Sequence, residues 1–189
     1  MNQFDIVLVV GYFRSASAYL AIIRCLAHKI RIGVISNNED IALRRKTSAA
    51  HDLYVKLCVQ FGAELIELDQ NVKTRLIVVQ QFLYSESLAK AITRKVHAEK
   101  IVGLLNLATA GLEKHDYFLE QFGIRKVYVP SKRFMNFLVK NRCASERYRD
   151  LHIEEVGLPY KDYPVFPDFS ADWLIAAPTM FSFRNEKGK

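Results

Sequence analysis

The sequence contains few cysteines, and their positions exclude several classes of protein. Only three occur among the 189 residues: Cys25, Cys58 and Cys143. Their spacing matches neither a zinc site nor a redox motif, and an odd number does not form a complete disulfide framework. Because each lies among apolar neighbours, we expect all three to be buried structural thiols. A reducing, cytoplasmic environment fits this pattern best.

Long apolar runs and a targeting segment are also missing. No apolar stretch approaches the ~20 residues that span a bilayer. The run DIVLVV at residues 5–10 is short, begins with an acidic residue and is followed by no cleavage-site pattern. We therefore expect a protein that is cytoplasmic and soluble, or at most peripheral at the inner face of the membrane.

Cofactor and nucleic-acid motifs are absent as well. The sequence has no G-x-G-x-x-G fingerprint, Walker loop, zinc spacing or nucleic-acid motif. We expect no cofactor, no bound metal and no nucleic-acid partner. The net charge of +7 nevertheless favours an anionic partner, such as a nucleotide sugar or an acidic membrane surface.

The residues that are present alternate between strand and helix patterns. Half of the chain is hydrophobic and a quarter is charged, which is a globular composition. Continuous apolar runs predict buried parallel strands, and runs with a three-to-four-residue period predict helices. Together they predict an α/β, Rossmann-like, doubly wound parallel sheet. The expected strands are 5–10, 30–36, 63–69, 75–82, 100–107, 126–131 and 153–159, and the expected helices are 17–27, 47–61, 85–97, 111–123 and 132–142.

The character of the sequence changes after residue 158. The stretch 159–169 contains three of the five prolines with four interspersed aromatics, which is typical of an ordered, extended linker. An apolar, strand-like segment follows at 172–183. We expect a first domain at 1–158, a linker at 159–170, and at 171–189 either the start of a truncated second domain or a strand added to the first sheet.

Two polar loops follow predicted strands, where open α/β sheets bind their ligands. In the first, Gly11 allows close approach of a ligand to the backbone, and Arg14 could grip a phosphate or carboxylate. Tyr12 and Ser15 complete this loop. The alternative is that Arg14 is a solvated loop charge.

The second loop offers amides and a phenol after the fourth predicted strand. Gln80, Gln81 and Tyr84 suit the recognition of hydroxyl groups. The alternative is that the amides satisfy backbone groups at the edge of the sheet.

A third loop follows the fifth predicted strand. Asn106, Thr109 and Gly111 lie in a turn of small residues that opens a helix, whose first amides can bind an anion. Lys114 and His115 add a cation and a candidate acid or base. A surface helical role for His115 is the alternative.

A basic segment begins after Pro130. Lys and Arg side chains lie opposite Phe134, Phe137 and Leu138 in the predicted helix 132–142. Such a helix could contact anionic lipid, or it could be a solvated basic face over an ordinary core stripe.

The C-terminal third resembles a known family. The segments VYVPSKRFMNFLVKN, IEEVGLPYKDY and DWLIAAPT are similar to GT-B fold glycosyltransferases, most of all to the CDP-glycerol glycerophosphotransferase-like group and its capsule and O-antigen relatives. In that family a G-x-P-x-x-D turn precedes a linker, and a strand ending in "APT" opens the second domain. The matching positions are Gly157, Pro159, Asp162, Ala177, Pro178 and Thr179.

This resemblance implies the N-terminal, acceptor-side half of a GT-B enzyme of surface polysaccharide synthesis. Its partners would be a nucleotide-activated donor and a polysaccharide or lipid-linked acceptor. Related enzymes carry a "WHG-x-x-K" loop, whereas this chain has NLATAGLEK, so no histidine precedes Gly111. Without the donor-binding half, we expect the chain to be inactive. Two alternatives stay open: a stand-alone binding module for a small anion or a protein, and half of a nucleotide-sugar epimerase.

Overall fold

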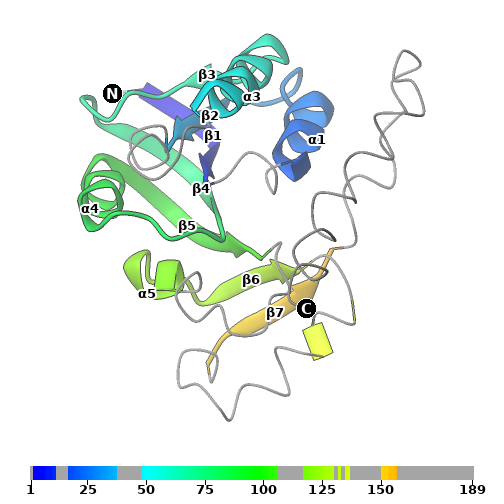
Figure 1. Cartoon of the computed structure of the whole chain (residues 1–189), viewed down its shortest axis with the longest axis vertical. Coiled ribbons are helices and arrows are strands. Elements are labelled where there is room, and N and C mark those ends of the chain that lie inside the picture. Colours follow the sequence, from blue (N-terminus) through cyan, green and yellow to red (C-terminus); the bar gives the residue numbers. More distant parts are fainter. Residues whose placement is uncertain are drawn as a thin grey trace, which may run out of the picture.

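A parallel sheet of seven strands forms the centre of the structure (Figure 1). The computed structural model describes residues 2–11, 17–37, 48–105, 117–129, 132, 135–136 and 150–156. Within them the strand order is β3-β2-β1-β4-β5-β6-β7, and every pairing is parallel. The strands are β1 (Asn2–Val10), β2 (Ile32–Ser36), β3 (Glu64–Leu65), β4 (Val72–Gln80), β5 (Val96–Leu104), β6 (Lys126–Val129) and β7 (His152–Glu155).

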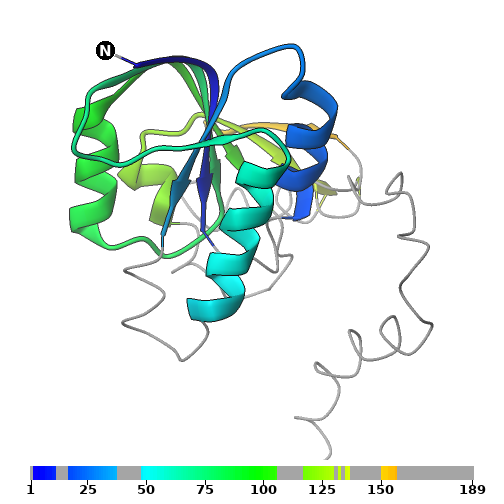
Figure 2. The same ribbon diagram turned by 90° about the horizontal axis from the view of Figure 1, so that it is seen from above.

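Helices cover both faces of the sheet (Figure 2), which confirms the predicted α/β, doubly wound, Rossmann-like fold. The helices are α1 (Ser17–Leu26), α3 (Ser48–Gln60), α4 (Glu86–Lys95) and α5 (Phe118–Gln121). Helices α1 and α3 pack on one face, and α4 and α5 pack on the other. This arrangement follows from right-handed crossovers, because the chain moves from β1 towards β3 and then from β4 towards β7 in opposite directions.

The carboxyl halves of the central strands are the most deeply buried backbone. The last four residues of β1 and the last four of β4 are all buried. Their sequences, VLVV and IVVQ, are apolar except for the final glutamine. A strand that is covered on both faces needs such a continuous apolar run.

Helix α4 has well-defined ends. The Ser85 side chain caps its first turn by accepting the Leu88 N–H at 3.2 Å. Glu86 lies in the first turn and Lys95 in the last, so both charges suit the helix dipole. The helix ends directly at Val96, the first residue of β5, and no loop separates the two elements.

Three adjacent strands share an irregularity at one level of the sheet. Phe4 and Val7 belong to the same core although a regular strand would point them to opposite faces. The same holds for Val72 and Ile77 in β4, and for Val96 and Ile101 in β5. In β1 the N–H groups of Asp5 and Ile6 both donate to the Arg31 carbonyl, a pattern typical of a β-bulge. The side-chain alternation therefore shifts by one residue in all three strands, at the level of Asp5, Arg75 and Glu99.

The observed elements refine the predicted boundaries. β1, β4 and β5 begin three or four residues earlier than predicted, and β5 takes the last residues of the predicted helix 85–97. The predicted strand 63–69 shortens to two residues, because from Ile66 onward the chain crosses over the α4 face of the sheet. The predicted helix 132–142, apart from residues 132, 135 and 136, and the segments 159–170 and 171–189 lie outside the described residues.

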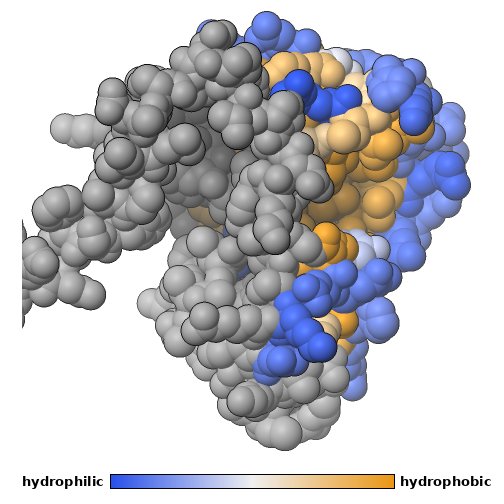
Figure 3. All heavy atoms as spheres, turned by 90° about the vertical axis from the view of Figure 1, so that its right-hand side faces the viewer, coloured by the Kyte–Doolittle hydropathy of each residue, from blue (hydrophilic) through white to orange (hydrophobic). Residues whose placement is uncertain are grey.

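The described surface is not uniformly polar. On the side of the molecule that carries α1, apolar side chains gather in an area bordered by hydrophilic ones (Figure 3). Cys58 of α3 is buried, as predicted, but Cys25 of α1 is exposed, which corrects the expectation of a buried thiol. An α-helix presents some positions to solvent whatever their polarity, and Cys25 occupies one of them. Cys143 lies outside the described residues.

Candidate functional site

The sheet has one point where the direction of winding reverses, between β1 and β4. The two strands are hydrogen-bonded neighbours, but the crossover after β1 leads one way along the sheet and the crossover after β4 leads the other way. Loops at the carboxyl ends of two such strands diverge and leave a crevice in which open α/β sheets bind ligands. The residues that follow β1 and β4 are therefore the first candidates for a site.

Gly11 and Gln80 join the ends of β1 and β4. The Gly11 N–H donates to Gln80 Oε1 at 2.8 Å, and the Gln80 side chain is fully buried. Tyr84, from the turn after β4, donates its hydroxyl to the Gln80 carbonyl at 2.8 Å. The amide of Gln80 thus satisfies a backbone group at the sheet edge, which is the structural alternative that the sequence left open.

Packing against the turn after β4 requires a glycine at position 11. A Cβ atom at this position would lie 2.5 Å from Cβ of Phe82 and 3.0 Å from the Tyr84 hydroxyl oxygen. The space that a side chain would occupy is filled by the turn after β4. The glycine therefore permits this turn to fold against the end of β1, and a ligand has no access to that space.

Tyr19 of α1 also links the two central strands near their carboxyl ends. It is completely buried, and its hydroxyl donates to the Val78 carbonyl at 2.9 Å and lies 3.2 Å from the Val9 carbonyl. Burial raises the pKa of Tyr19 well above its ordinary value. The hydroxyl therefore stays protonated and acts as a fixed donor to the two central strands.

Gln81 extends the ladder beyond β4. Its N–H donates to the Leu104 carbonyl at 2.9 Å, and the residue is buried. Gly11, Gln80, Gln81 and Tyr84 thus lie together and form a buried framework at the carboxyl ends of β1 and β4. The other predicted site residues lie outside the described residues: Tyr12, Arg14, Ser15, Asn106, Thr109, Gly111, Lys114 and His115.

Asn37, directly after β2, is a polar residue that was not among the candidates predicted from the sequence. It is only 1% exposed. Its Nδ2 lies 3.5 Å from the Gly11 carbonyl, and its Oδ1 is buried without a hydrogen-bond partner among the described residues. An unsatisfied buried polar group costs about 1–3 kcal/mol. Turning the amide over would place its oxygen against the Gly11 carbonyl, so the unsatisfied group is an acceptor.

A cavity of about 590 Å³ opens beside Asn37, between the ends of β2 and β3 and the first turns of α4. This volume lies in the range of about 300–1,000 Å³ that is common for small-molecule sites. Its lining is mixed, with six apolar residues, three uncharged polar residues and one carboxylate. The lining residues are Ile35, Ser36, Asn37, Leu65, Ile66, Glu67, Leu68, Ser87, Leu88 and Ala91.

The charge of this cavity differs from that of the whole chain. The chain carries a net charge of +7, yet among the described residues the only charged one in the lining is Glu67. Glu86 adds a second carboxylate in the first turn of α4, where it pairs with Lys90. The cap from Ser85 already occupies one of the amides that an anion would use at this helix end.

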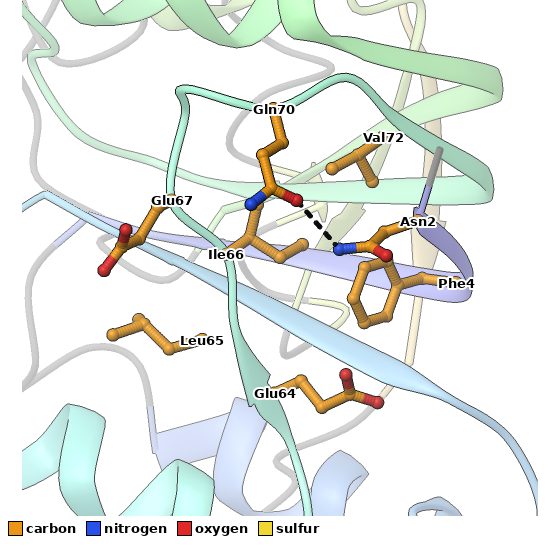
Figure 4. Close-up of a pocket in the computed structure, with 8 residues that line it drawn as sticks. All are labelled: Asn2, Phe4, Glu64, Leu65, Ile66, Glu67, Gln70 and Val72. Atoms are coloured by element: carbon orange, nitrogen blue, oxygen red, sulfur yellow. Dashed lines mark hydrogen bonds between the residues drawn. The ribbon is translucent and has the colours of Figure 1, made fainter.

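Two further cavities lie at the opposite, amino-terminal part of the sheet. One of about 190 Å³ surrounds the start of β1, where Asn2 Nδ2 donates to Gln70 Oε1 at 3.2 Å across its opening (Figure 4). The other, of about 690 Å³, is an open depression beside Asp5, Arg75 and Glu99. The first also borders Leu65, Ile66 and Glu67 at the end of β3, and its Asn2–Gln70 pair satisfies two polar groups that face each other. The second lies away from the carboxyl ends of the strands.

Charged residues at the amino edge of the sheet form a structural network of an ion pair and hydrogen bonds. Arg31 Nη2 lies 2.7 Å from Glu64 Oε2, and the Arg31 N–H donates to Asp5 Oδ2 at 2.9 Å. The hydrogen bond from Arg31 lowers the pKa of Glu64. This network joins the starts of β1, β2 and β3, and both members of the ion pair remain half-exposed.

Two features are absent from the described part of the chain. No group of three or more His, Cys, Asp or Glu residues there could hold a metal ion. No helix among these residues has the length and apolar character needed to cross a membrane.

In the comparisons with known proteins, no protein-family model matches the chain, and no curated protein matches it significantly in sequence.

Proposed function

We propose that this chain is the acceptor-side domain of a transferase that uses a nucleotide-activated donor in surface polysaccharide synthesis. The observation that carries the proposal is the cavity beside Asn37, at the carboxyl edge of the sheet. Its described lining has two serine hydroxyls, one carboxylate and no cation, which suits a hydroxylated acceptor better than a nucleotide diphosphate. The resemblance of residues 100–183 to GT-B enzymes assigns the donor to a second domain.

Two buried titratable groups near this edge, Tyr19 and Cys58, are unsuited to acid–base chemistry. At this edge the Tyr19 hydroxyl is held in its protonated form, and burial raises the pKa of Cys58 to about 11. Both groups lie on the α1–α3 side, away from the cavity. The Glu67 carboxylate is the described candidate for a base at the cavity, and Lys114 and His115 are the further candidates proposed from the sequence.

The proposed reaction is a substitution at the activated donor. The acceptor oxygen forms a bond to the transferred sugar or glycerol phosphate, the bond to the nucleotide leaving group breaks, and the acceptor proton passes to a base. Binding both substrates in a cleft between two domains would supply most of the catalysis through orientation.

The test is a transfer assay on the natural gene product that contains this chain. Release of nucleotide from CDP-glycerol or a nucleotide sugar should require an added acceptor, and His115→Ala should lower kcat with little change in donor KM. As a matched control, His97→Ala changes an exposed histidine at the start of β5 and should leave kcat unchanged. Failure of every donor tested, or acceptor-independent release that His115→Ala does not affect, would contradict the proposal.

A stand-alone binding module is the second candidate. It is favoured by the self-contained fold, because residues 2–156 already hold seven strands with an apolar core on each face. Limited proteolysis distinguishes the two. Cleavage within 159–170 that leaves a folded fragment favours a hinge to a second domain, whereas a resistant segment favours the module.

A further inference from the structure

We infer that the outer side of α1 and the depression next to it form the contact between two copies of this chain. In this contact α1 of each copy lies in the depression of the other. The inference goes beyond the proposed function, because it concerns assembly and is tested without any transfer reaction. The surface, called the α1 surface below, consists of Ala21, Ile22, Cys25 and Leu26 of α1 and of Ile6, Ile30 and Leu76 around the depression.

Helix α1 is apolar around nearly its whole circumference. Its sequence, SAYLAIIRCL, contains one charged residue, Arg24. Tyr19 and Ile23 face the core and are completely buried. The side turned away from the core carries Ala21, which is half-buried, and Cys25, which is exposed. Since a helix that is apolar on all sides is normally buried, we expect another element to cover this outer side.

The two flanks of α1 differ in what lies next to them. On the flank towards α3, the Arg24 guanidinium lies 5.3 Å from the centre of the Phe61 ring. The other flank carries Ile22 and Leu26, which are half-buried, and the Leu26 carbonyl accepts the Ile30 N–H at 3.0 Å just beyond the helix. No described helix lies beside this second flank, because α4 and α5 pack on the opposite face of the sheet.

The open depression of about 690 Å³ adjoins this second flank. Ile6 of β1 and Leu76 of β4 are paired in register, line the depression and are half-buried, and Ile30 lines it next to α1. A ridge and a depression thus lie side by side on the face where apolar side chains gather (Figure 3). A two-fold contact needs such a self-complementary surface, because the rotation that places one ridge in one depression does the same for the second pair.

The charges around the depression also permit a contact between identical chains. Asp5 and Glu99 are negative, Arg75 and Lys100 are positive, and their charges sum to zero. Two chains with a net charge of +7 each can therefore meet here without setting like charges against each other. Arg75 and Glu99 are exposed, and neither forms an ion pair among the described residues. In a two-fold contact, each can pair with the opposite charge on the other copy.

The experiment is sedimentation equilibrium of the 189-residue chain at concentrations from about 1 to about 100 μM. We expect the mass to rise to twice that of one chain. Cys25→Glu changes an exposed helical position, so the fold should persist, and it places an unpaired charge in the contact. It should weaken the dimer at least about tenfold. Val59→Glu, at an exposed apolar position of α3, is the matched control and should dimerise as the native chain does.

A charge reversal tests the depression from the other side of the contact. Arg75→Glu gives the depression an excess of negative charge, so it should weaken the dimer, and adding Glu99→Arg should restore it. Arg94→Glu makes the same change on α4, on the opposite face of the sheet, and should have no effect. Circular dichroism of each variant confirms that it is folded.

The Cys25 thiol gives an independent readout. Its rate of reaction with a thiol reagent should fall as the protein concentration rises, because the dimer covers it. A chain that stays monomeric, native affinity in Cys25→Glu, or dissociation caused by Val59→Glu would overturn the inference. A monomer whose Cys25 is protected at every concentration would also overturn it, because another part of the same molecule would then cover α1.

Discussion

Replacing Gly11 with alanine should destabilise the fold through a contact that no side-chain rotation can relieve. The new Cβ would lie 2.5 Å from Cβ of Phe82, and both atoms are fixed to the backbone. The end of β1 or the turn 81–84 must therefore move. Gly11 is not among the described glycines with positive φ, so the effect is steric and does not come from an unfavourable backbone conformation.

The expected loss of stability follows from the packing and hydrogen bonds that this movement disturbs. Overpacking in a close-packed region typically costs about 1–3 kcal/mol. The shift also strains the 2.8 Å bond from Gly11 to Gln80 and the 2.8 Å bond from Tyr84 to the Gln80 carbonyl. Losing one such bond adds about 1 kcal/mol. We expect Gly11→Ala to lower the free energy of unfolding by about 2–4 kcal/mol, measured by urea denaturation with an unchanged m-value.

Two comparisons test the steric explanation for Gly11→Ala. Gly123 has φ of 60°, and no described atom lies within 4 Å of the place that a Cβ would take, so Gly123→Ala should cost only the conformational term of about 1–2 kcal/mol. In a Phe82→Ala background, Cβ of residue 82 remains and most of the Gly11→Ala effect should persist. In a Phe82→Gly background the effect should largely disappear. Full rescue by Phe82→Ala, or no rescue by Phe82→Gly, would refute the steric explanation.

Three further outcomes follow from buried polar groups. Asn37→Leu should raise the free energy of unfolding by about 1 kcal/mol in urea, because it removes an unsatisfied acceptor and loses only a 3.5 Å contact; a loss of stability would contradict this. Tyr19→Phe should cost about 1 kcal/mol at pH 7. Because burial raises the pKa of Tyr19, its contribution is present below the ordinary pKa of 10.0 and is lost at higher pH, so Tyr19→Phe should lose less stability above pH 10 than the native chain. Exposed Cys25 should react with a thiol reagent at pH 8, whereas buried Cys58, with a pKa of about 11, should react only after unfolding; equal rates would exclude the described burial.

The fold class was predictable because buried parallel strands and amphipathic helices carry different periods. The starts of the strands were not predictable from those periods. In β1, β4 and β5 the apolar alternation shifts by one residue at Asp5, Arg75 and Glu99, so each regular pattern begins only there. The predicted strands began at 5, 75 and 100, whereas the observed ones begin at 2, 72 and 96.

The sequence predicted that Gly11, Gln80 and Tyr84 lie at the carboxyl edge of the sheet, but it did not predict what they contact. A sequence does not show whether space beside a glycine serves a ligand or a neighbouring turn. Asn37 was not among the predicted residues, although it follows β2 as directly as Gly11 follows β1. Applying the same rule to every strand end would have pointed to it.

The shared irregularity at Asp5, Arg75 and Glu99 has a consequence for how the strands find their partners. Parallel strands with plain apolar runs can slip past one another by one or two residues with little loss of burial. Here a slipped strand would set its irregular residue against a regular one on each neighbour, and the cores on both sides would lose contacts together. The three aligned irregularities therefore help to fix the register of β1, β4 and β5, because they disfavour shifted pairings as the sheet assembles.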